Sequence, residues 1–403
     1  MGEKLEESKK LNGLKELADK YKKIREKYDS LNALIEANNP WTDENITKLS
    51  KDFFEALKND DKEFSWLNVD DKLLSLPSHD ISIDYGIPSH VRGDVEDGTV
   101  FLCLVNPNID AKVAMCEACQ MKNKEKIKKY IFDSSHEGGI LFKEIVELKG
   151  MKNLIGLEES DEDKNQGKNK IGYYTANYLN VILSAIDDYK NKDERKSKYL
   201  QEAVKSFRIF ISNLKENDDL NKQIKEEKEV NKESLTDFVK MSKKIVNLEA
   251  FPFRSSSPKF AKKGNKNAGK RFANCLVKSK SNVSMLSSRI IIWKILEYIN
   301  NPKDKVKPVF IIRRFNRAWR PSIENVLIED FGVEDDKDIN KIINELHKEY
   351  FYTLGYIDTD NLSSMDTSLY KEDVNIYNKK EKRKEFNKRI SDALSLQKDN
   401  NGN

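Results

Sequence analysis

The pattern of apolar and polar residues predicts four short buried strands separated by helices. The first is a run of six apolar residues, 100–105, that ends abruptly at Asn106-Pro107, because proline has no amide hydrogen to donate to a sheet. Three later runs, at 244–249, 308–313 and 350–357, are further strand candidates. Helical patterns precede the last two runs. This alternation predicts an α/β fold, with a four-stranded parallel sheet flanked by helices.

The remaining regions are mostly helical by their periodicity. We expect residues 1–75 to form a helical N-terminal extension and 76–403 an α/β domain with a helical insertion at about 111–240. A last helix at 379–396 would cover one face of the sheet. The loop-like stretch 75–98 is rich in proline and glycine.

The N-terminal helix, expected over residues 4–38, carries a heptad stripe of apolar residues. We favour packing of this stripe on the chain's own core, and the alternative is a contact surface for a partner. A second helix begins near Trp41, with Thr42 or Asp43 as its N-cap. The stripe comprises Leu14, Leu17, Tyr21, Ile24, Tyr28, Leu31 and Ile35.

Composition narrows the class of protein. The chain has 403 residues, of which 38% are hydrophobic and 35% charged, and its net charge is +4, so the total charge indicates no particular partner. No apolar run reaches the roughly 20 residues that span a bilayer, and no signal peptide is evident, so we expect a cytoplasmic protein. Cys116-x-x-Cys119 is half of a metal-site pattern without a second close pair. The sequence therefore predicts no metal and no cofactor.

Small polar groups follow three of the four predicted strands. Because the carboxyl ends of parallel strands meet at one edge of a sheet, these groups should converge there. Amides, hydroxyls and two phenylalanines around one cleft would suit a planar, hydrogen-bonding ligand such as a nucleobase. The alternatives are an ordinary Asn-Pro turn and core packing of the phenylalanines. The residues concerned are Asn106, Asn108, Asp110, Asn247, Phe251, Phe253, Arg254, Ser255, Asn361 and Ser363.

In order and kind these motifs resemble the uracil-DNA glycosylase superfamily. The family's first motif is a hydrophobic strand ending in Gly-x-Asn-Pro-Gly, and Leu104-Val-Asn-Pro-Asn108 is similar to it. A second strand in the family ends in an asparagine that reads the base, and Val246-Asn247-Leu248 resembles it. The last motif is His-Pro-Ser or Asn-Pro-Ser, and Asn361-Leu362-Ser363 resembles it.

The resemblance covers roughly residues 85–110, where 88–94 looks like the family's lead-in, and 240–395. Two positions depart from the family pattern: Asn108 replaces a common glycine, and Leu362 replaces the usual proline. The helical regions are outside the resemblance, or are an enlarged insertion within it.

The resemblance implies a monofunctional DNA glycosylase that flips a base out of the duplex and hydrolyses its N-glycosidic bond, leaving an abasic site. The altered motifs point to a modified base and, by analogy, to anti-phage defence. Asn106, Asn108, Asp110, Asn361 and Ser363 would be catalytic, with Asn106 orienting the water. The substrate-binding residues would be Asn247, Phe251, Phe253, Arg254 and Ser255.

A basic segment supports DNA as the partner. Residues 259–280 contain eight lysines and arginines and no acidic residue, and cations on a flexible loop can neutralise phosphates. A solvated surface is the alternative for this segment. A second basic and aromatic cluster at 313–320 would grip the strand or cap a helix. The predicted DNA-binding residues are Lys259, Lys262, Lys263, Lys266, Lys270 and Arg271.

Two other functions remain alternatives. One is a non-catalytic protein that binds nucleic acid on the same α/β scaffold. The other is a nucleotide-processing enzyme of a different α/β family. It is disfavoured because no glycine-rich phosphate loop follows any predicted strand.

Overall fold

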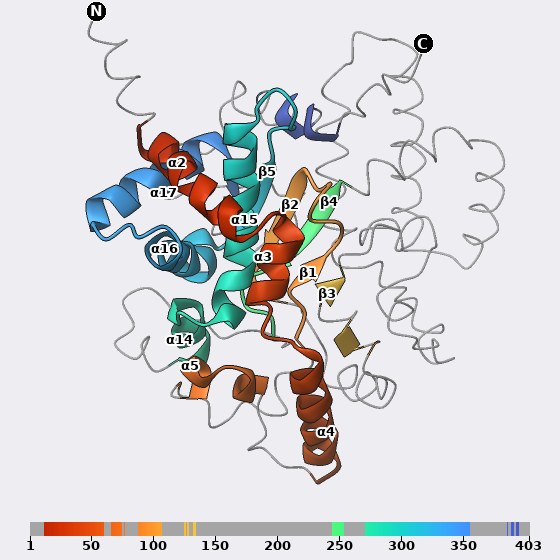
Figure 1. Ribbon diagram of the computed structural model, residues 1–403. Coiled ribbons are helices and arrows are strands. Elements are labelled where there is room, and N and C mark those ends of the chain that lie inside the picture. The colour runs from red at the N-terminus through yellow and green to blue at the C-terminus, as the bar shows by residue number, and fades with distance from the viewer. Residues whose placement is uncertain are drawn as a thin grey trace, which may run out of the picture.

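A computed structural model shows a central sheet with helices packed against it (Figure 1). The described residues are 12–59, 66–74, 76, 88–106, 125, 127–128, 132–133, 244–253, 271–354, 385, 388–390 and 392–394.

All four predicted strands are present, and they form a parallel core. In spatial order they are β4 (Ile245–Glu249), β2 (Val100–Leu104), β5 (Val309–Arg313) and β6 (Phe351–Leu354), and each neighbouring pair is parallel. Every residue of β2 and β4 is buried, as expected for strands covered on both faces.

The sheet as a whole is mixed, so the prediction of a four-stranded parallel sheet was wrong in detail. β1 (Val91–Arg92) pairs antiparallel with β4, and β3 (Phe132–Asp133) pairs parallel with β1. Each added strand has only two residues, too few to show a hydrophobic alternation in the sequence. The α/β class is confirmed.

Helices that connect the parallel strands cover one face of the sheet. α14 (Phe272–Lys278) and α15 (Asn282–Asn300) lie between β4 and β5, whereas α16 (Arg320–Glu329) and α17 (Asp336–Glu349) lie between β5 and β6. Right-handed crossovers in the same direction bring these helices to the same face. The sheet contributes stacked aromatic rings to this core, with centroids 4.8 Å apart for Phe101 and Phe310.

The N-terminal helix is broken into α2 (Asn12–Lys27) and α3 (Leu31–Asn38), contrary to the single helix expected over 4–38. Ser30 causes the break because its backbone is extended and its side chain accepts a hydrogen bond from the Ala33 amide at 3.1 Å. The apolar stripe packs against α15 and α17, within the chain's own core. This buried stripe is therefore not a free surface for a partner.

Among the described residues, three further helices lie between α3 and β1. In front of α4 (Asp43–Asn59), the Thr42 hydroxyl accepts a hydrogen bond from the Asn45 amide at 3.3 Å. Thr42 rather than Asp43 is therefore the N-cap. The short helices η1 (Trp66–Val69) and α5 (Asp71–Leu74) come next.

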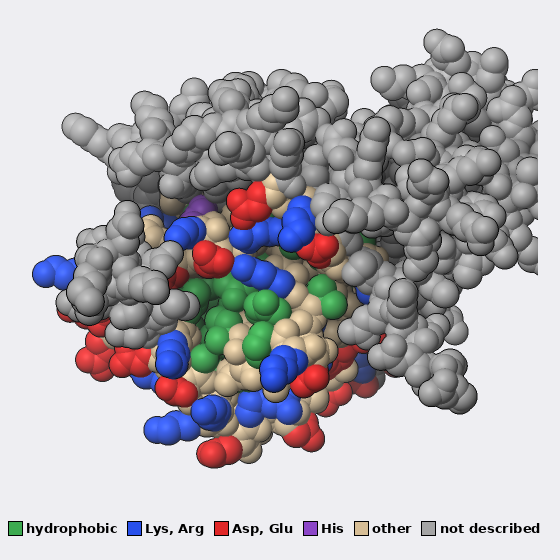
Figure 2. Space-filling model, turned by 90° about the horizontal axis from the view of Figure 1, so that it is seen from above, with side chains coloured by type: hydrophobic (Ala, Val, Ile, Leu, Met, Phe, Trp, Pro, Cys, Tyr) green, Lys and Arg blue, Asp and Glu red, His purple; other side chains and the backbone are tan. Residues whose placement is uncertain are grey.

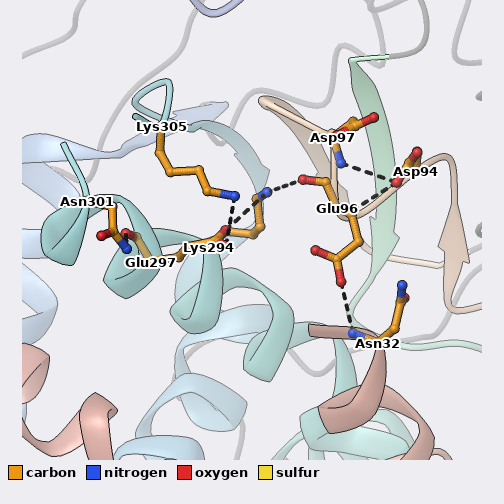
Figure 3. A network of polar contacts seen from close by, with 8 residues as sticks. All are labelled: Asn32, Asp94, Glu96, Asp97, Lys294, Glu297, Asn301 and Lys305. Carbon is orange, nitrogen blue, oxygen red and sulfur yellow. Dashed lines mark hydrogen bonds and ion pairs between the residues drawn. The ribbon is translucent and has the colours of Figure 1, made fainter. Parts of the chain in front are cut away.

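The turn between β1 and β2 is tied to two helices by polar contacts (Figure 3). Asp94 accepts hydrogen bonds from the amides of Glu96 and Asp97 at 2.9 and 3.2 Å. The buried Lys294 ammonium on α15 donates to the Glu96 carbonyl at 2.7 Å, and the Asn32 amide at the start of α3 donates to the Glu96 carboxylate at 3.1 Å.

The opposite face of the sheet contacts C-terminal residues. Thr99 donates a hydrogen bond to the Ala393 carbonyl at 2.5 Å, and the Arg389 guanidinium lies 5.8 Å from the centre of the Tyr352 ring. The described residues between 385 and 394 are helical, in agreement with the predicted last helix. Of the region 111–240, only 125 and 127–128 are described as helical and 132–133 as strand. No helix in the described part of the chain is long and apolar enough to cross a membrane.

Candidate functional site at the carboxyl ends of the parallel strands

The carboxyl ends of β2 and β5 lie side by side where the chain leaves the sheet in opposite directions. The two strands pair up to Cys103 and Ile312, so the following residues, Leu104 and Arg313, lie at the same edge. After β2 the chain goes on to β3 and then β4 on one side, and after β5 it goes on to β6 on the other. Ligands of open α/β sheets bind at such a switch point. We therefore regard this edge as the candidate site.

Asn106 lies two residues past the end of β2 and is half-buried. The segment before it is held to β4 because the carbonyls of Leu104 and Val105 accept hydrogen bonds from the amides of Ala250 and Phe251, at 3.2 and 2.8 Å. Pairing with β4 therefore continues to the residue before Asn106. This places the Asn106 backbone firmly at the edge of the sheet.

Asn247 and Glu249 form a buried polar pair on β4, with exposed fractions of 4% and 2%. The Asn247 side-chain nitrogen donates to the Glu249 carboxylate at 3.1 Å. Contrary to expectation, Asn247 is the third residue of β4 rather than its end, so Glu249 is the one nearer the candidate site. Among the described residues, the Asn247 amide oxygen has no hydrogen-bond partner, although a buried acceptor without one costs about 1–3 kcal/mol.

Two neighbouring elements hold the backbone at Glu249. Its amide donates to the His90 carbonyl at 3.0 Å, next to β1. Its carbonyl accepts from the Ser287 hydroxyl on α15 at 2.8 Å. The carboxylate therefore stands on a rigid part of the sheet.

Phe251 and Phe253 follow β4 and are fully buried in an aromatic cluster. Their ring centres are 5.7 Å apart, and Phe272 and Trp41 pack against them at 5.7 and 6.3 Å. The structure therefore favours core packing over stacking on a base for both phenylalanines. Periodicity alone could not separate these roles, because an apolar ring after a strand fits either.

His90 also lies in this cluster, with its ring centre 5.9 Å from that of Trp41. Burial lowers the pKa of its imidazole to about 3, so the ring is neutral at ordinary pH. Neither ring nitrogen has a hydrogen-bond partner within the described ranges.

The residues after β5 are functional candidates that sequence reasoning treated only as a basic and aromatic cluster. Arg313 ends β5, and Arg314 precedes the π-helix η5 (Phe315–Trp319), so both lie at the switch point. The third predicted strand ends in two arginines rather than in small polar groups. Its end was therefore not grouped with Asn106 from the sequence.

The basic segment 259–280 is not a loop over its whole length, because α14 occupies 272–278 and buries Phe272 and Leu276. Arg271 is exposed just before this helix. Lys280 bonds to Glu329 at 2.6 Å, and this hydrogen bond holds the pKa of that carboxyl below its usual range. The other predicted site residues lie outside the described residues: Asn108, Asp110, Arg254, Ser255, Lys259, Lys262, Lys263, Lys266, Lys270, Asn361 and Ser363.

Two thiols lie within the described residues, Cys103 and Cys275. Cys103 is buried, and burial together with the nearby Glu249 raises the pKa of its thiol well above the ordinary value. Burial also raises the pKa of Cys275. Cys116 and Cys119 lie outside the described residues. In the part of the chain that the structure describes, no three potential metal ligands come together.

The face of the molecule seen from above carries both kinds of charge (Figure 2). Lysine and arginine side chains alternate with acidic ones around a group of hydrophobic side chains. Because the signs are interspersed, the described residues on this face do not form a continuous basic surface for a polyanion.

Comparison with known proteins gives no match. No family model, no curated protein and no solved structure is significantly similar to the chain. Its function must therefore be inferred from its own residues.

Proposed function

We propose that the chain is a monofunctional DNA glycosylase that flips a base into the carboxyl edge of the sheet and hydrolyses its N-glycosidic bond. The observation that carries this proposal is the position of Asn106 at the switch point, next to the strand that bears Asn247 and Glu249. Glu249, 143 positions after Asn106 in the sequence, pairs with Leu104 and thus approaches the same edge. Asn106 and Asn247 both belong to the motifs that resemble the uracil-DNA glycosylase superfamily.

Asn106 would orient the attacking water. Departure of the base builds positive charge on the sugar, and the water needs little deprotonation to attack such a centre. A positioned amide oxygen is therefore sufficient, provided that its backbone is held in place as that of Asn106 is. The Glu249 carboxylate, one strand away, would favour the positive charge on the sugar.

Asn247 would contact the edge of the flipped base. One N–H of its amide is already bonded to Glu249, which leaves the amide oxygen and the second N–H for a ligand. An oxygen acceptor pairs with a ring N–H or an exocyclic amine. The departures at Asn108 and Leu362 favour a modified base, and anti-phage defence is the role we propose for its removal.

The non-catalytic alternative also has an observation in its favour. Phe251 and Phe253 are enclosed by other rings, so neither offers an open face on which a flipped base could stack. A protein that only binds nucleic acid on this scaffold would not need such a face.

A panel of DNA duplexes tests the proposal. Each duplex carries one normal or modified base at a single position and is incubated with the purified full chain and then with alkali, which cleaves at abasic sites. Cleavage at one type of base supports the glycosylase. DNA binding without cleavage of any duplex in a broad panel favours the non-catalytic alternative.

A further inference from the structure

Arg314 has an unusual backbone conformation. Its φ and ψ of 52° and 45° are left-handed, and it is the only non-glycine residue with a positive φ in the described part of the chain. This conformation costs an ordinary residue roughly 1–2 kcal/mol, and asparagine or aspartate can offset the cost through a local hydrogen bond. Arginine has no such compensation here, because its side chain makes no capping bond to η5.

Backbone and serine contacts hold this conformation without help from the Arg314 side chain. The Arg314 carbonyl accepts hydrogen bonds from the amides of Arg317 and Ala318 at 3.1 and 3.0 Å. At the other end of η5, Ser322 donates to the Trp319 carbonyl at 3.1 Å and lies 2.5 Å from the Ser288 hydroxyl. Glycine would fit this position with less strain. The fold therefore does not account for an arginine here, which suggests a role in binding.

The exposure of the Arg314 side chain and the residues around it are consistent with a role in binding. The side chain is exposed, and among the described residues no hydrogen bond or ion pair to it is found. It directly follows the end of β5, beside the end of β2 that leads to Asn106. Arg313 and Arg317, both half-buried, add two positive charges nearby. Single π-helical turns such as η5 are frequent at functional sites.

We propose that Arg314 binds a backbone phosphate of DNA at the carboxyl edge of the sheet. A guanidinium can donate two parallel hydrogen bonds to phosphate oxygens. Because Arg314 is exposed and follows the end of β5, its guanidinium would contact a DNA strand whose target nucleotide enters beside Asn106. The identification of the phosphate as part of DNA rests on the proposed function.

Three variants of the full chain test this role. Arg314→Gly removes the cation and relieves the strain of the backbone, whereas Arg314→Lys keeps the charge. Lys303→Gly is the control, because it removes another exposed cation from the turn before β5, at the opposite edge of the sheet. The affinity of each for one duplex is measured from low to moderate salt, with thermal unfolding alongside.

We expect Arg314→Gly to be at least as stable as the parent, to bind DNA about tenfold more weakly at low salt, and to lower the slope of log affinity against log salt by about one. Arg314→Lys should keep the slope, and so should Lys303→Gly. An unchanged slope and affinity in Arg314→Gly would overturn the proposal, as would a loss of thermal stability with normal binding, which would assign the arginine to the fold.

The outcome is separable from that of the proposed function. Base release by the same preparations is measured independently. A reduced slope in a protein that releases no base would support the phosphate contact and remove the glycosylase. Base release together with an unchanged slope would support the glycosylase and remove the phosphate contact.

Discussion

The hydrogen bond between Asn247 and Glu249 changes how the role of Asn247 can be tested. Replacing Asn247 by aspartate would bring two buried carboxylates together. An uncompensated charge of this kind costs about 3 kcal/mol or more. Loss of activity in that variant could then follow from instability alone, so the partner must be changed with it.

We predict that Asn247→Asp combined with Glu249→Gln regains most of the stability that Asn247→Asp alone loses. In the double variant the new glutamine donates to the new aspartate, so the buried hydrogen bond is retained with its direction reversed. Glu249→Gln by itself removes the carboxylate proposed to favour charge on the sugar. Compared with that variant, the double variant should release less base or prefer a different base, since phosphate contacts supply general affinity and edge contacts supply selection. Thermal unfolding and release from two base substrates are measured, with Glu249→Gln as control. Release equal to that of Glu249→Gln on both substrates, together with regained stability, would show that Asn247 is only structural.

His90 predicts a specific sensitivity to acid. Its folded pKa of about 3 lies below the ordinary value of 6.5, so between these pH values only the unfolded chain takes up the proton. Stability should therefore fall as the pH drops through this window, by about 1.4 kcal/mol per pH unit for one such group. Burial and Arg320 similarly lower the pKa of His347 to about 4. Both histidines therefore contribute to the loss of stability as the pH falls from 6.5 to about 4.

His90→Phe should remove the His90 share of this acid sensitivity. We expect the dependence of the unfolding free energy on pH to become shallower by about 1.4 kcal/mol per unit between pH 6 and 4. At pH 7 the stability should stay close to that of the parent, because no hydrogen bond to the ring is found among the described residues. Urea unfolding at several pH values measures both quantities. An unchanged pH dependence would mean that the imidazole is protonated as readily in the folded state as in the unfolded state.

At the scale of elements, Lys294 joins α15 to the turn before β2. Its ammonium is buried, donates to the Glu96 carbonyl and lies 3.6 Å from the Glu297 carboxylate. Burial lowers the pKa of this lysine, and Glu297 partly offsets the effect. Glu297 has a second partner, Lys305, at 3.0 Å.

We predict that Lys294→Met lowers the unfolding free energy by roughly 1–3 kcal/mol, because the Glu96 carbonyl loses a charged donor. Lys305→Met is the matched control, since it removes a more exposed partner of the same carboxylate and should cost under about 1 kcal/mol. Denaturant unfolding measures both variants. Equal losses in the two would show that the contact with Glu96 adds nothing to the stability.

The elements differ in how far the sequence reveals them. Continuous apolar runs predicted β2 and β5, because strands covered on both faces show no polar alternation. β4 and β6 were predicted although Asn247, Glu249 and Thr353 interrupt their apolar residues. The break between α2 and α3 was missed because the heptad stripe continues across it from Tyr28 to Leu31. Only the capping side chain of Ser30 marks the break. β1 and β3 were missed because two-residue strands depend on pairing partners rather than on their own pattern.

At the scale of the whole molecule, the sequence predicted that a site lies at the carboxyl edge of the sheet, but it predicted only some of the side chains there. Asn106 follows β2 as expected, since proline at 107 had to end the strand. The bond from Asn247 to Glu249 could have been anticipated, because alternate residues of a strand share a face. The left-handed conformation of Arg314 has no counterpart in the sequence, where glycine or asparagine would have marked such a position.

The most direct test of the central claim is to identify the free base by mass spectrometry after incubation of the full chain with DNA that contains the responsive base. The parent should release one base and leave an abasic site. Asn106→Ala should bind the same DNA with similar affinity but release the base roughly 10²–10⁴ times more slowly, as expected for the loss of one positioned catalytic group. Release at the parent's rate by Asn106→Ala, or no free base from any DNA that the parent binds, would contradict the account.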